Sequence, residues 1–275
     1  MKKWYAVIGD PIAHSLSPFM HEIWFQENDI DASFLPIHVE PSKLKQACEA
    51  LHLLGASGFN VTVPHKQAII PLLDGIDDTA AKMNAVNTVV RNGKKFKGSN
   101  TDGDGFVQSL RTANPKVDSR ILLVGAGGAA RGISFALNRA GFKDVTITNR
   151  TFRRAEELAA ETGSKAVTKA EAEQILNGFD IIIQTTSVGL AEDEALPISL
   201  EKVREGTLAA DIVYNPIDTP FLKKAEEKGC KTLNGVGMFV YQGAISFEKW
   251  TGIKPDTEKM IQVITEKLGG NYVNR

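Results

Sequence analysis

The chain has 275 residues, of which 43% are hydrophobic and 24% are charged, a composition typical of a soluble globular protein rather than a disordered one. Its 32 basic and 33 acidic residues give a formal net charge of −1, so no global field favours nucleic acid or an anionic membrane surface. No uncharged apolar stretch approaches the roughly 18 residues of a membrane span, and the apolar run near the N-terminus is too short for a signal peptide. The length allows two domains of ordinary size.

The cysteines and histidines show no pattern of a metal or redox site. Cys48 and Cys230 lie far apart, and the five histidines form no metal-binding motif. Low cysteine usage agrees with a reducing compartment. We therefore expect a cytoplasmic protein with no metal, no nucleic-acid partner and no membrane partner.

Strand-like runs alternate with amphipathic helical runs along the whole chain, which is typical of an α/β protein. In the first part we expect strands at 4–9, 33–39, 59–63 and 85–91, and helices near 18–28, 42–54 and 66–73. A second series begins after Asp102, with helices expected at 103–113, 129–141, 152–163 and 168–177, and strands at 121–127, 144–150, 165–167, 180–187, 207–214 and 231–235. A further helix is expected from Pro220, and two more near 237–249 and 256–268.

The second series predicts a six-stranded doubly wound sheet of the Rossmann type. The stretch "GSNTDGDG" between the two series is glycine-rich and polar, as expected of a hinge. We therefore expect two domains: an N-terminal α/β domain (1–101), joined by the C-terminal helices (237–275), and a Rossmann domain (102–236).

The stretch "LLVGAGGAARG" carries a dinucleotide-binding fingerprint. Gly125, Gly127 and Ala130 fill the G-x-G-x-x-A pattern between an expected buried strand and an expected helix. The first glycine permits a tight turn, the second lets the backbone approach a pyrophosphate, and the alanine allows close packing of helix on sheet. The alternative is an ordinary glycine-rich turn, but the strand and the helix around the motif favour dinucleotide binding.

The end of the next strand favours NADP over NAD. An NAD site would place Asp or Glu there to hold the ribose 2′-hydroxyl, whereas this chain has Asn149, Arg150 and Thr151, followed by Arg153 and Arg154. Guanidinium groups suit a 2′-phosphate because they are planar, charged and bidentate. The alternative is an ordinary basic helix start, although cations at a helix N-terminus oppose its dipole.

Two polar stretches of the first part favour a small polar ligand. In "NVTVPHK" we expect Asn60 and Thr62 on one face of a strand, valines on the other, and Lys66 where the strand has ended. In "HSLSP", Ser17 reads as an N-cap, and with Ser15 it would offer hydroxyls to a carboxylate at a helix N-terminus. Both have plain alternatives, namely a solvated lysine and a simple helix cap.

Eight motifs in order along nearly the whole chain resemble the NADP-dependent shikimate dehydrogenase family. They are "GDPIAHSLSP", "FNVTVPHK", "AVNTVV", "NTDGDG", "GAGGAARG", "NRT" with a following arginine, "DIVYNP" and "NGVGMFVYQGA". The resemblance implies an N-terminal substrate domain with a Rossmann domain for NADP, and the reversible reduction of 3-dehydroshikimate to shikimate by NADPH.

The resemblance also implies roles for individual residues. It makes Lys66 and Asp102 the catalytic pair, in which a lysine ammonium donates a proton to the reduced ketone and an aspartate keeps it charged. Substrate contacts fall, together with Asn60 from the strand pattern, on Ser15, Ser17, Thr62, Asn87, Asp102, Tyr214 and Gln242. Cofactor contacts fall on Asp78, Gly125, Ala126, Gly127, Gly128, Ala129, Asn149, Arg150, Thr151, Arg154, Ile212 and Gly235.

The chain departs from the family pattern at two places. Asn84 stands where a glycine is common, and Gln184-Thr185 stands where Asn-Ala is common. The first concerns a loop near the substrate and the second concerns contacts beside the nicotinamide. Neither departure replaces a residue of the implied catalytic pair, Lys66 and Asp102.

Two alternative functions remain. One is a broader quinate/shikimate dehydrogenase that uses NAD, and the other is a non-catalytic NADP(H)-sensing module. A preference for NAD over NADP would indicate the quinate/shikimate dehydrogenase. Binding of NADP without turnover of a shikimate-like acid would indicate the sensing module. We expect a small-molecule substrate and either a monomer or a homodimer.

Overall fold

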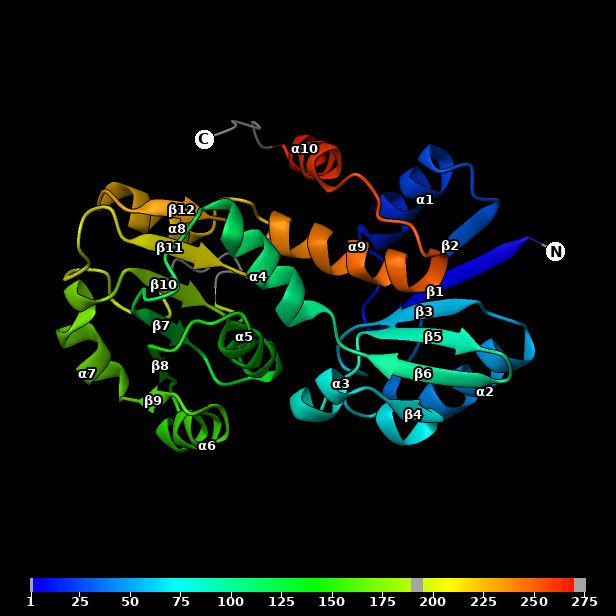
Figure 1. Cartoon of the computed structure of the whole chain (residues 1–275), viewed down its shortest axis with the longest axis horizontal. Helices are drawn as coiled ribbons and strands as arrows, with labels where there is room; N and C mark the ends of the chain where they lie inside the picture. Colours follow the sequence, from blue (N-terminus) through cyan, green and yellow to red (C-terminus); the bar gives the residue numbers. More distant parts are fainter. Residues whose placement is uncertain (1, 189–194, 270–275) are drawn as a thin grey trace. The chain divides into compact units, whose positions relative to one another are not determined.

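The computed structural model describes residues 2–188 and 195–269, which form two compact units (Figure 1). The first unit contains residues 1–101 and 242–260, and the second contains 102–241 and 261–275. Helix α9 (Val236–Thr251) and helix α10 (Thr257–Lys267) each begin in one unit and end in the other. No helix within the described ranges is both long and apolar enough to cross a membrane.

The first unit is built on a mixed six-stranded sheet in the order β2-β1-β3-β5-β6-β4. β1 pairs in parallel with β2 and β3, whereas β5 pairs antiparallel with β3 and β6. The elements of this unit are β1 (Lys3–Gly9), α1 (Ser17–Glu27), β2 (Ala32–His38), η1 (Pro41–Lys43), α2 (Leu44–Leu53), β3 (Gly58–Val61), η2 (Ile70–Leu72), β4 (Gly75–Ile76), α3 (Asp78–Met83), β5 (Thr88–Asn92) and β6 (Lys95–Ser99).

Both faces of this sheet are covered, because successive side chains of a strand point to opposite faces. Ala6 and Ile8 of β1 pack in the apolar core that includes the buried residues of α2. Tyr5, the residue before Ala6, packs instead on Phe25 of α1 and Trp250 of α9, with ring centroids 5.3 and 5.0 Å apart. The sheet is therefore a rigid platform for the loops that follow its strands.

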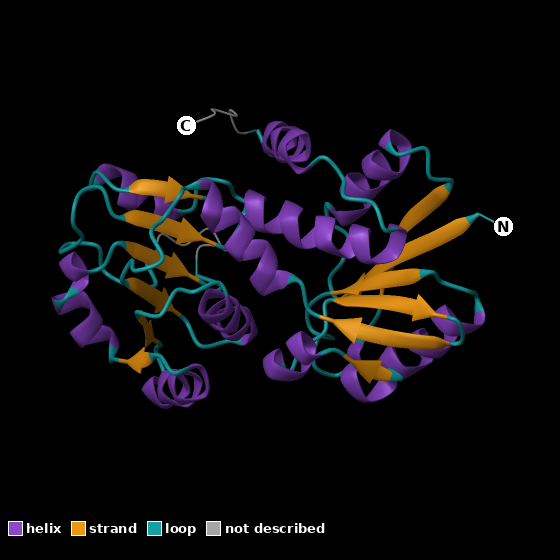
Figure 2. Ribbon diagram, viewed as in Figure 1, coloured by secondary structure: helices purple, strands orange, loops and turns teal. Residues whose placement is uncertain are grey.

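The second unit is a parallel six-stranded sheet in the order β12-β11-β10-β7-β8-β9, with helices around it (Figure 2). The order runs outward in both directions from β7, which confirms the predicted doubly wound Rossmann sheet. The elements are α4 (Asp102–Thr112), β7 (Ile121–Val124), α5 (Gly128–Arg139), β8 (Val145–Thr148), α6 (Phe152–Thr162), β9 (Lys165–Ala166), α7 (Lys169–Gln174), η3 (Leu176–Gly178), β10 (Ile181–Gln184), β11 (Leu208–Asp211), α8 (Pro220–Glu227) and β12 (Lys231–Leu233).

The central strands of this sheet are apolar on both faces, as expected of parallel strands with helices on each side. Ile121 and Leu123 of β7 belong to the core that contains the buried face of α5. Leu122 and Val124 belong to a second core, which contains the buried face of α8. The carboxyl ends of the strands consequently lie along one edge, where a doubly wound sheet binds its ligand.

Two expected elements of the first unit are wrong. The strand expected at 59–63 ends at Val61, because a turn closed by His65 N to Thr62 O (2.9 Å) begins there, and Val63 is 66% exposed. The helix expected at 66–73 is replaced by turns and the short η2. The reason is that the carbonyl of Lys66, which such a helix would use internally, accepts from Val86 N instead (2.7 Å).

The expected cap of the first helix is also wrong by one residue. α1 begins at Ser17 itself, with Leu16 at the cap position and no side-chain cap hydrogen bond. Instead the hydroxyl of Ser15 accepts from Ser17 N at 3.3 Å. β4, β6 and α3 were not expected from the sequence, because all three are short and lack an extended apolar pattern.

Candidate active site

A cavity of about 340 Å³ opens at the carboxyl ends of β7 and β8 in the second unit. Thr148 ends β8 and is 1% exposed, and its hydroxyl has no hydrogen-bond partner within the described structure. A buried hydroxyl without a partner at a cavity wall suits a polar ligand, because such a group otherwise costs free energy. The cavity is lined by Val124, Gly125, Thr148, Asn149, Arg150, Thr151, Arg154, Lys169, Thr186, Ser187, Val188, Leu196 and Pro197.

The glycine-rich turn after β7 leaves space where a dinucleotide phosphate would lie. Gly125 has φ of +120°, and a Cβ there would lie 2.4 Å from the hydroxyl of Thr185. A Cβ on Gly127 or Gly128 would instead meet no described atom within 4 Å. α5 begins at Gly128, so the N–H groups and positive dipole end of this 12-residue helix face the space. Ala130 is fully buried in the core, as its place in the fingerprint predicts.

The arginines after β8 divide into two groups. Arg150 and Arg154 line the cavity, whereas Arg153 pairs with Glu157 at 2.9 Å on an exposed part of α6. Asn149 donates to the carbonyl of Thr151 at 3.0 Å, which fixes the loop between them. No Asp or Glu is among the described residues that line the cavity. The residues therefore fit the 2′-phosphate of NADP better than the free 2′-hydroxyl of NAD.

The remaining fingerprint residues and the second departure from the family pattern lie beside this turn. Ala126 and Ala129 are half-buried. Gln184 is fully buried, and its amide donates to the carbonyls of Thr186 (3.1 Å) and Val188 (2.9 Å). Gln184 therefore shapes the loop that forms one wall of the cavity rather than facing the cavity itself.

Three further predicted residues meet where the chain leaves β11. Gly235 N donates to the carbonyl of Val213 at 3.1 Å, and a Cβ on Gly235 would lie 2.4 Å from the carbonyl oxygen of Ile212. The ring of Tyr214 stacks on Phe239 with centroids 4.6 Å apart. Burial raises the pKa of the Tyr214 hydroxyl, so this group stays protonated as a donor.

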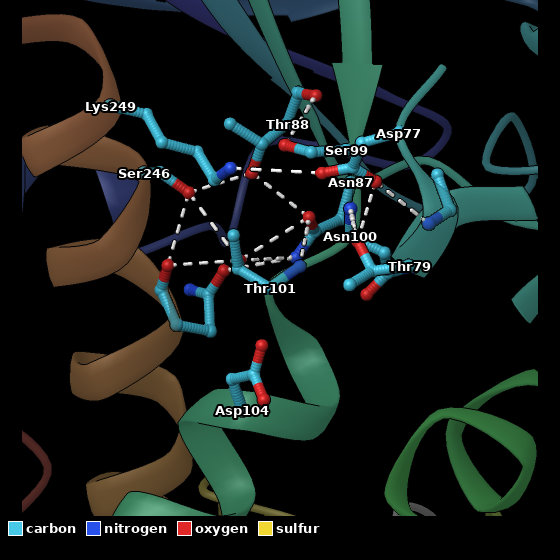
Figure 3. Close-up of polar contacts among 12 residues, drawn as sticks. Asp77, Thr79, Asn87, Thr88, Ser99, Asn100, Thr101, Asp104, Ser246 and Lys249 are labelled. Atoms are coloured by element: carbon cyan, nitrogen blue, oxygen red, sulfur yellow. Dashed lines mark hydrogen bonds and ion pairs between the residues drawn. The ribbon is translucent and has the colours of Figure 1, made fainter. Parts of the chain in front are cut away.

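In the first unit, Asn87 is the centre of a buried network of amides and hydroxyls (Figure 3). Its Oδ1 accepts from Thr101 N and from the hydroxyl of Thr88, both at 2.9 Å. Its Nδ2 donates to the hydroxyl of Thr101 (2.9 Å) and to Oε1 of Gln242 (3.4 Å). These hydrogen bonds therefore fix the orientation of the Asn87 amide group, and they bring Asn87 and Gln242 together.

The amide of Asn60 belongs to the same network. Its Nδ2 donates to the carbonyl of Asn87 (3.0 Å) and to the hydroxyl of Ser246 (3.2 Å), and the residue is 7% exposed. Ser246 also donates to the carbonyl of Gln242 at 3.0 Å. Asn60 therefore lies in the same buried network as Asn87, and its contact with a ligand stays a prediction.

The sequence-based prediction missed Thr88, Thr101 and Ser246. The first two stand inside the motifs "AVNTVV" and "NTDGDG", next to the predicted site residues Asn87 and Asp102. Ser246 follows Gln242 by one helical turn of α9, a spacing that places both on one face.

The other predicted substrate residues of the first unit lie in loops or at the start of α1. Ser15 and Ser17 stand at the start of α1, as described above, and Ser17 is 8% exposed. Thr62 is half-buried, and a Cβ on Gly9 would lie 2.4 Å from its methyl group, so the loop approaches β1 closely. Lys66 is half-buried, and its carbonyl holds Val86, the residue before Asn87.

The last predicted residues stand at helix starts. Asp78 is exposed and opens α3, which Asp77 caps by accepting from Ala80 N at 2.9 Å. Asn84, the first departure from the family pattern, ends α3 with φ of +48°, a left-handed conformation that Asn tolerates better than most residues. Asp102 is half-buried and opens α4 in the second unit. Within the described ranges, no group of three or more His, Cys, Asp or Glu residues could hold a metal.

Models of known protein families match residues in both units. Residues 7–89 match the shikimate dehydrogenase substrate binding domain, residues 110–216 match shikimate / quinate 5-dehydrogenase, and residues 235–265 match the shikimate 5′-dehydrogenase C-terminal domain.

Individual relatives match over their full length. The shikimate dehydrogenase (NADP(+)) of Lysinibacillus sphaericus is 53% identical over 98% of this chain and 100% of that protein. The crystal structure of shikimate 5-dehydrogenase from Thermus thermophilus in complex with NADP(H) and shikimate has a TM-score of 0.89 at 35% identity, covering 96% of this chain and 99% of that one. Quinate dehydrogenase from Corynebacterium glutamicum in complex with NAD has a TM-score of 0.88 at 28% identity, covering 96% and 99%. This chain therefore belongs to the family of NADP-dependent shikimate dehydrogenases.

Proposed function

We propose that this chain catalyses the reversible reduction of 3-dehydroshikimate to shikimate, with NADPH bound in the cavity of the second unit and the acid bound by the first. The observation that carries the proposal is the cavity itself, where Arg150 and Arg154 stand beside the glycine-rich turn and the described lining contains no carboxylate. The proposal also draws on the family membership of the chain.

Neutral donors and acceptors suit the substrate side, because shikimate carries several hydroxyls and one carboxylate. Asn87 and Gln242 are held by the buried network and would bind hydroxyls, together with Thr62 and Tyr214. The start of α1 provides Ser15 and Ser17 near a positive dipole end, which favours the carboxylate.

The proposed chemistry needs one proton in addition to the hydride. NADPH, when bound, supplies the hydride to the carbonyl carbon. Negative charge then gathers on the carbonyl oxygen, so a donor that is protonated near neutral pH is required. We assign that role to the ammonium of Lys66, and we assign Asp102 to keep it charged and oriented.

The proposed domains differ from the two described units at the C-terminal helices. Residues 1–101 with residues 237–275 would form the substrate domain and residues 102–236 the NADP domain, whereas the second unit also contains residues 237–241 and 261–275. We also propose a cytoplasmic setting, which rests on the two buried free cysteines expected of a reducing compartment.

The direct test is an assay of NADPH formation. Purified protein is incubated with shikimate, quinate or neither acid, and with NADP or NAD in parallel. We expect the highest kcat/KM for shikimate with NADP. Higher kcat/KM with quinate and NAD would favour the quinate/shikimate dehydrogenase, and NADP binding with no turnover of either acid would favour a sensing module.

Cofactor choice has a sharper test in the arginines. The double variant Arg150→Ala with Arg154→Ala should weaken NADP binding far more than NAD binding, since each lost charge-assisted hydrogen bond is worth about 1.5–3 kcal/mol. Arg153→Ala is the matched control, because Arg153 lies outside the cavity and pairs with Glu157. Equal losses for both cofactors would show that the arginines act through folding alone.

A further inference from the structure

Asp211 is a buried carboxylate to which neither the family motifs nor the cavity assigns a role. It is the last residue of β11 and is 1% exposed. None of the ion pairs among the described residues includes it. Burying a carboxylate without a cation costs free energy. Hydrogen-bond donors must therefore compensate part of this cost.

Two donors hold this carboxylate, and they come from both ends of the segment 212–219. One oxygen accepts from Val213 N at 3.0 Å. The other oxygen accepts from the hydroxyl of Thr219 at 2.8 Å. Thr219 is fully buried and caps α8, where its hydroxyl accepts from Leu222 N at 3.2 Å. Asp211 therefore fastens the segment to the end of β11 and to the start of α8.

The fastened segment carries two residues of the proposed site. Ile212 is a proposed cofactor contact and Tyr214 a proposed substrate contact. On its other side the segment touches the backbone of Gly235, whose N–H donates to the Val213 carbonyl at 3.1 Å. A Cβ on Gly235 would lie 2.4 Å from the Ile212 carbonyl, so little room is left for the segment to move in that direction.

We infer that Asp211 is a positioning residue, whose carboxylate holds the 212–219 segment so that Ile212 meets the cofactor and Tyr214 meets the substrate. The inference rests on the proposed roles of these two residues. A carboxylate suits this position because both of its oxygens only accept, and the N–H of Val213 and the hydroxyl of Thr219 donate. Asparagine would offer a single acceptor oxygen, so either Val213 N or the Thr219 hydroxyl would lose its acceptor.

The shift in the pKa of Asp211 shows that burial makes its negative charge less favourable. Desolvation by burial raises the pKa of Asp211 to about 6, and the hydrogen bonds from Val213 and Thr219 oppose this rise. These two donors therefore compensate the lost hydration only in part.

The test compares four variants in the shikimate assay with NADP. Asp211→Asn and Thr219→Val should lower kcat/KM by about 10- to 100-fold in folded protein, because small displacements of positioning groups have effects of this order. Thr219→Ser keeps the hydroxyl and should retain a value close to that of the wild type. Asp144→Asn is the control, since Asp144 pairs with Lys165 and Arg120 at the surface of the same unit.

Separate constants distinguish positioning from loss of stability. KM for NADP and for shikimate should both rise in Asp211→Asn at a temperature well below its melting temperature. The inference would be overturned if Asp211→Asn had the same KM and kcat as the wild type. It would also be overturned if Asp211→Asn and Asp144→Asn changed these constants equally. If the wild type itself does not turn over shikimate, the proposed function fails instead. Titration of NADP against wild type and Asp211→Asn still tests the role of Ile212 in that case, and equal dissociation constants would overturn the inference.

Discussion

Replacing Asp211 with asparagine should change how the free energy of unfolding depends on pH. Burial raises the pKa of Asp211 from 3.8 to about 6, so the folded state binds this proton more tightly than the unfolded state does. The contribution of Asp211 to stability is therefore most favourable at low pH. It declines as pH rises from about 4 to about 6, and it is constant above that range.

The size of the effect follows from the two pKa values. The full decline is about 3 kcal/mol, since one pKa unit corresponds to about 1.4 kcal/mol. Roughly half of it, about 1.4 kcal/mol, falls between pH 5 and pH 7.5. The free energy of unfolding of Asp211→Asn minus that of the wild type should increase by this amount over the same interval, because asparagine does not titrate.

Urea unfolding followed by circular dichroism at pH 5, 6, 6.8 and 7.5 measures this difference directly. Asp180→Asn is a suitable control from the same unit. A hydrogen bond from the backbone of Arg120, followed by a side-chain hydrogen bond from Arg204, lowers the pKa of Asp180. Asp180 is therefore ionised in both states throughout this interval, and its variant should differ from the wild type by a constant amount. A constant difference for Asp211→Asn as well would refute the argument from burial.

Three further predictions concern the site itself. Lys66→Ala should lower turnover by about 10²–10⁴-fold, as measured by NADPH formation, while the dissociation constant for NADP stays near that of the wild type. Near-normal turnover would return Lys66 to the role of a solvated lysine. The double variant Ser15→Ala with Ser17→Ala should raise KM for shikimate and leave NADP affinity unchanged, and an unchanged KM in folded protein would assign both hydroxyls to the local turn. Gly125→Ala should weaken NADP binding in a fluorescence titration, because the new Cβ would lie 2.4 Å from the hydroxyl of Thr185 at a φ of +120°. Affinity equal to the wild type would show that the turn can relax without cost.

The sequence by itself determined the parts of this protein that depend on local patterns. The apolar run of β7, the glycines after it and the amphipathic α5 are adjacent in the chain, so the fingerprint and the doubly wound sheet could be predicted. The lack of a carboxylate in the residues that directly follow β8 likewise indicated the cofactor. Such features need only the spacing of side chains along one strand or one helix.

Tertiary structure decided the features in which a backbone or side-chain group could bond either within its own segment or to a distant one. The Lys66 carbonyl bonds to Val86 rather than within a helix, which cancels the helix expected at 66–73. Arg153 and Arg154 are neighbours in the sequence, yet only Arg154 lines the cavity, because the direction of each side chain depends on where α6 begins.

The buried polar groups depended most on the fold. Ser246 reaches Asn60 from 186 positions away, and Asp211 binds a hydroxyl eight positions further along the chain. A buried donor must find an acceptor wherever the packed chain brings one, and sequence spacing carries no information about that choice.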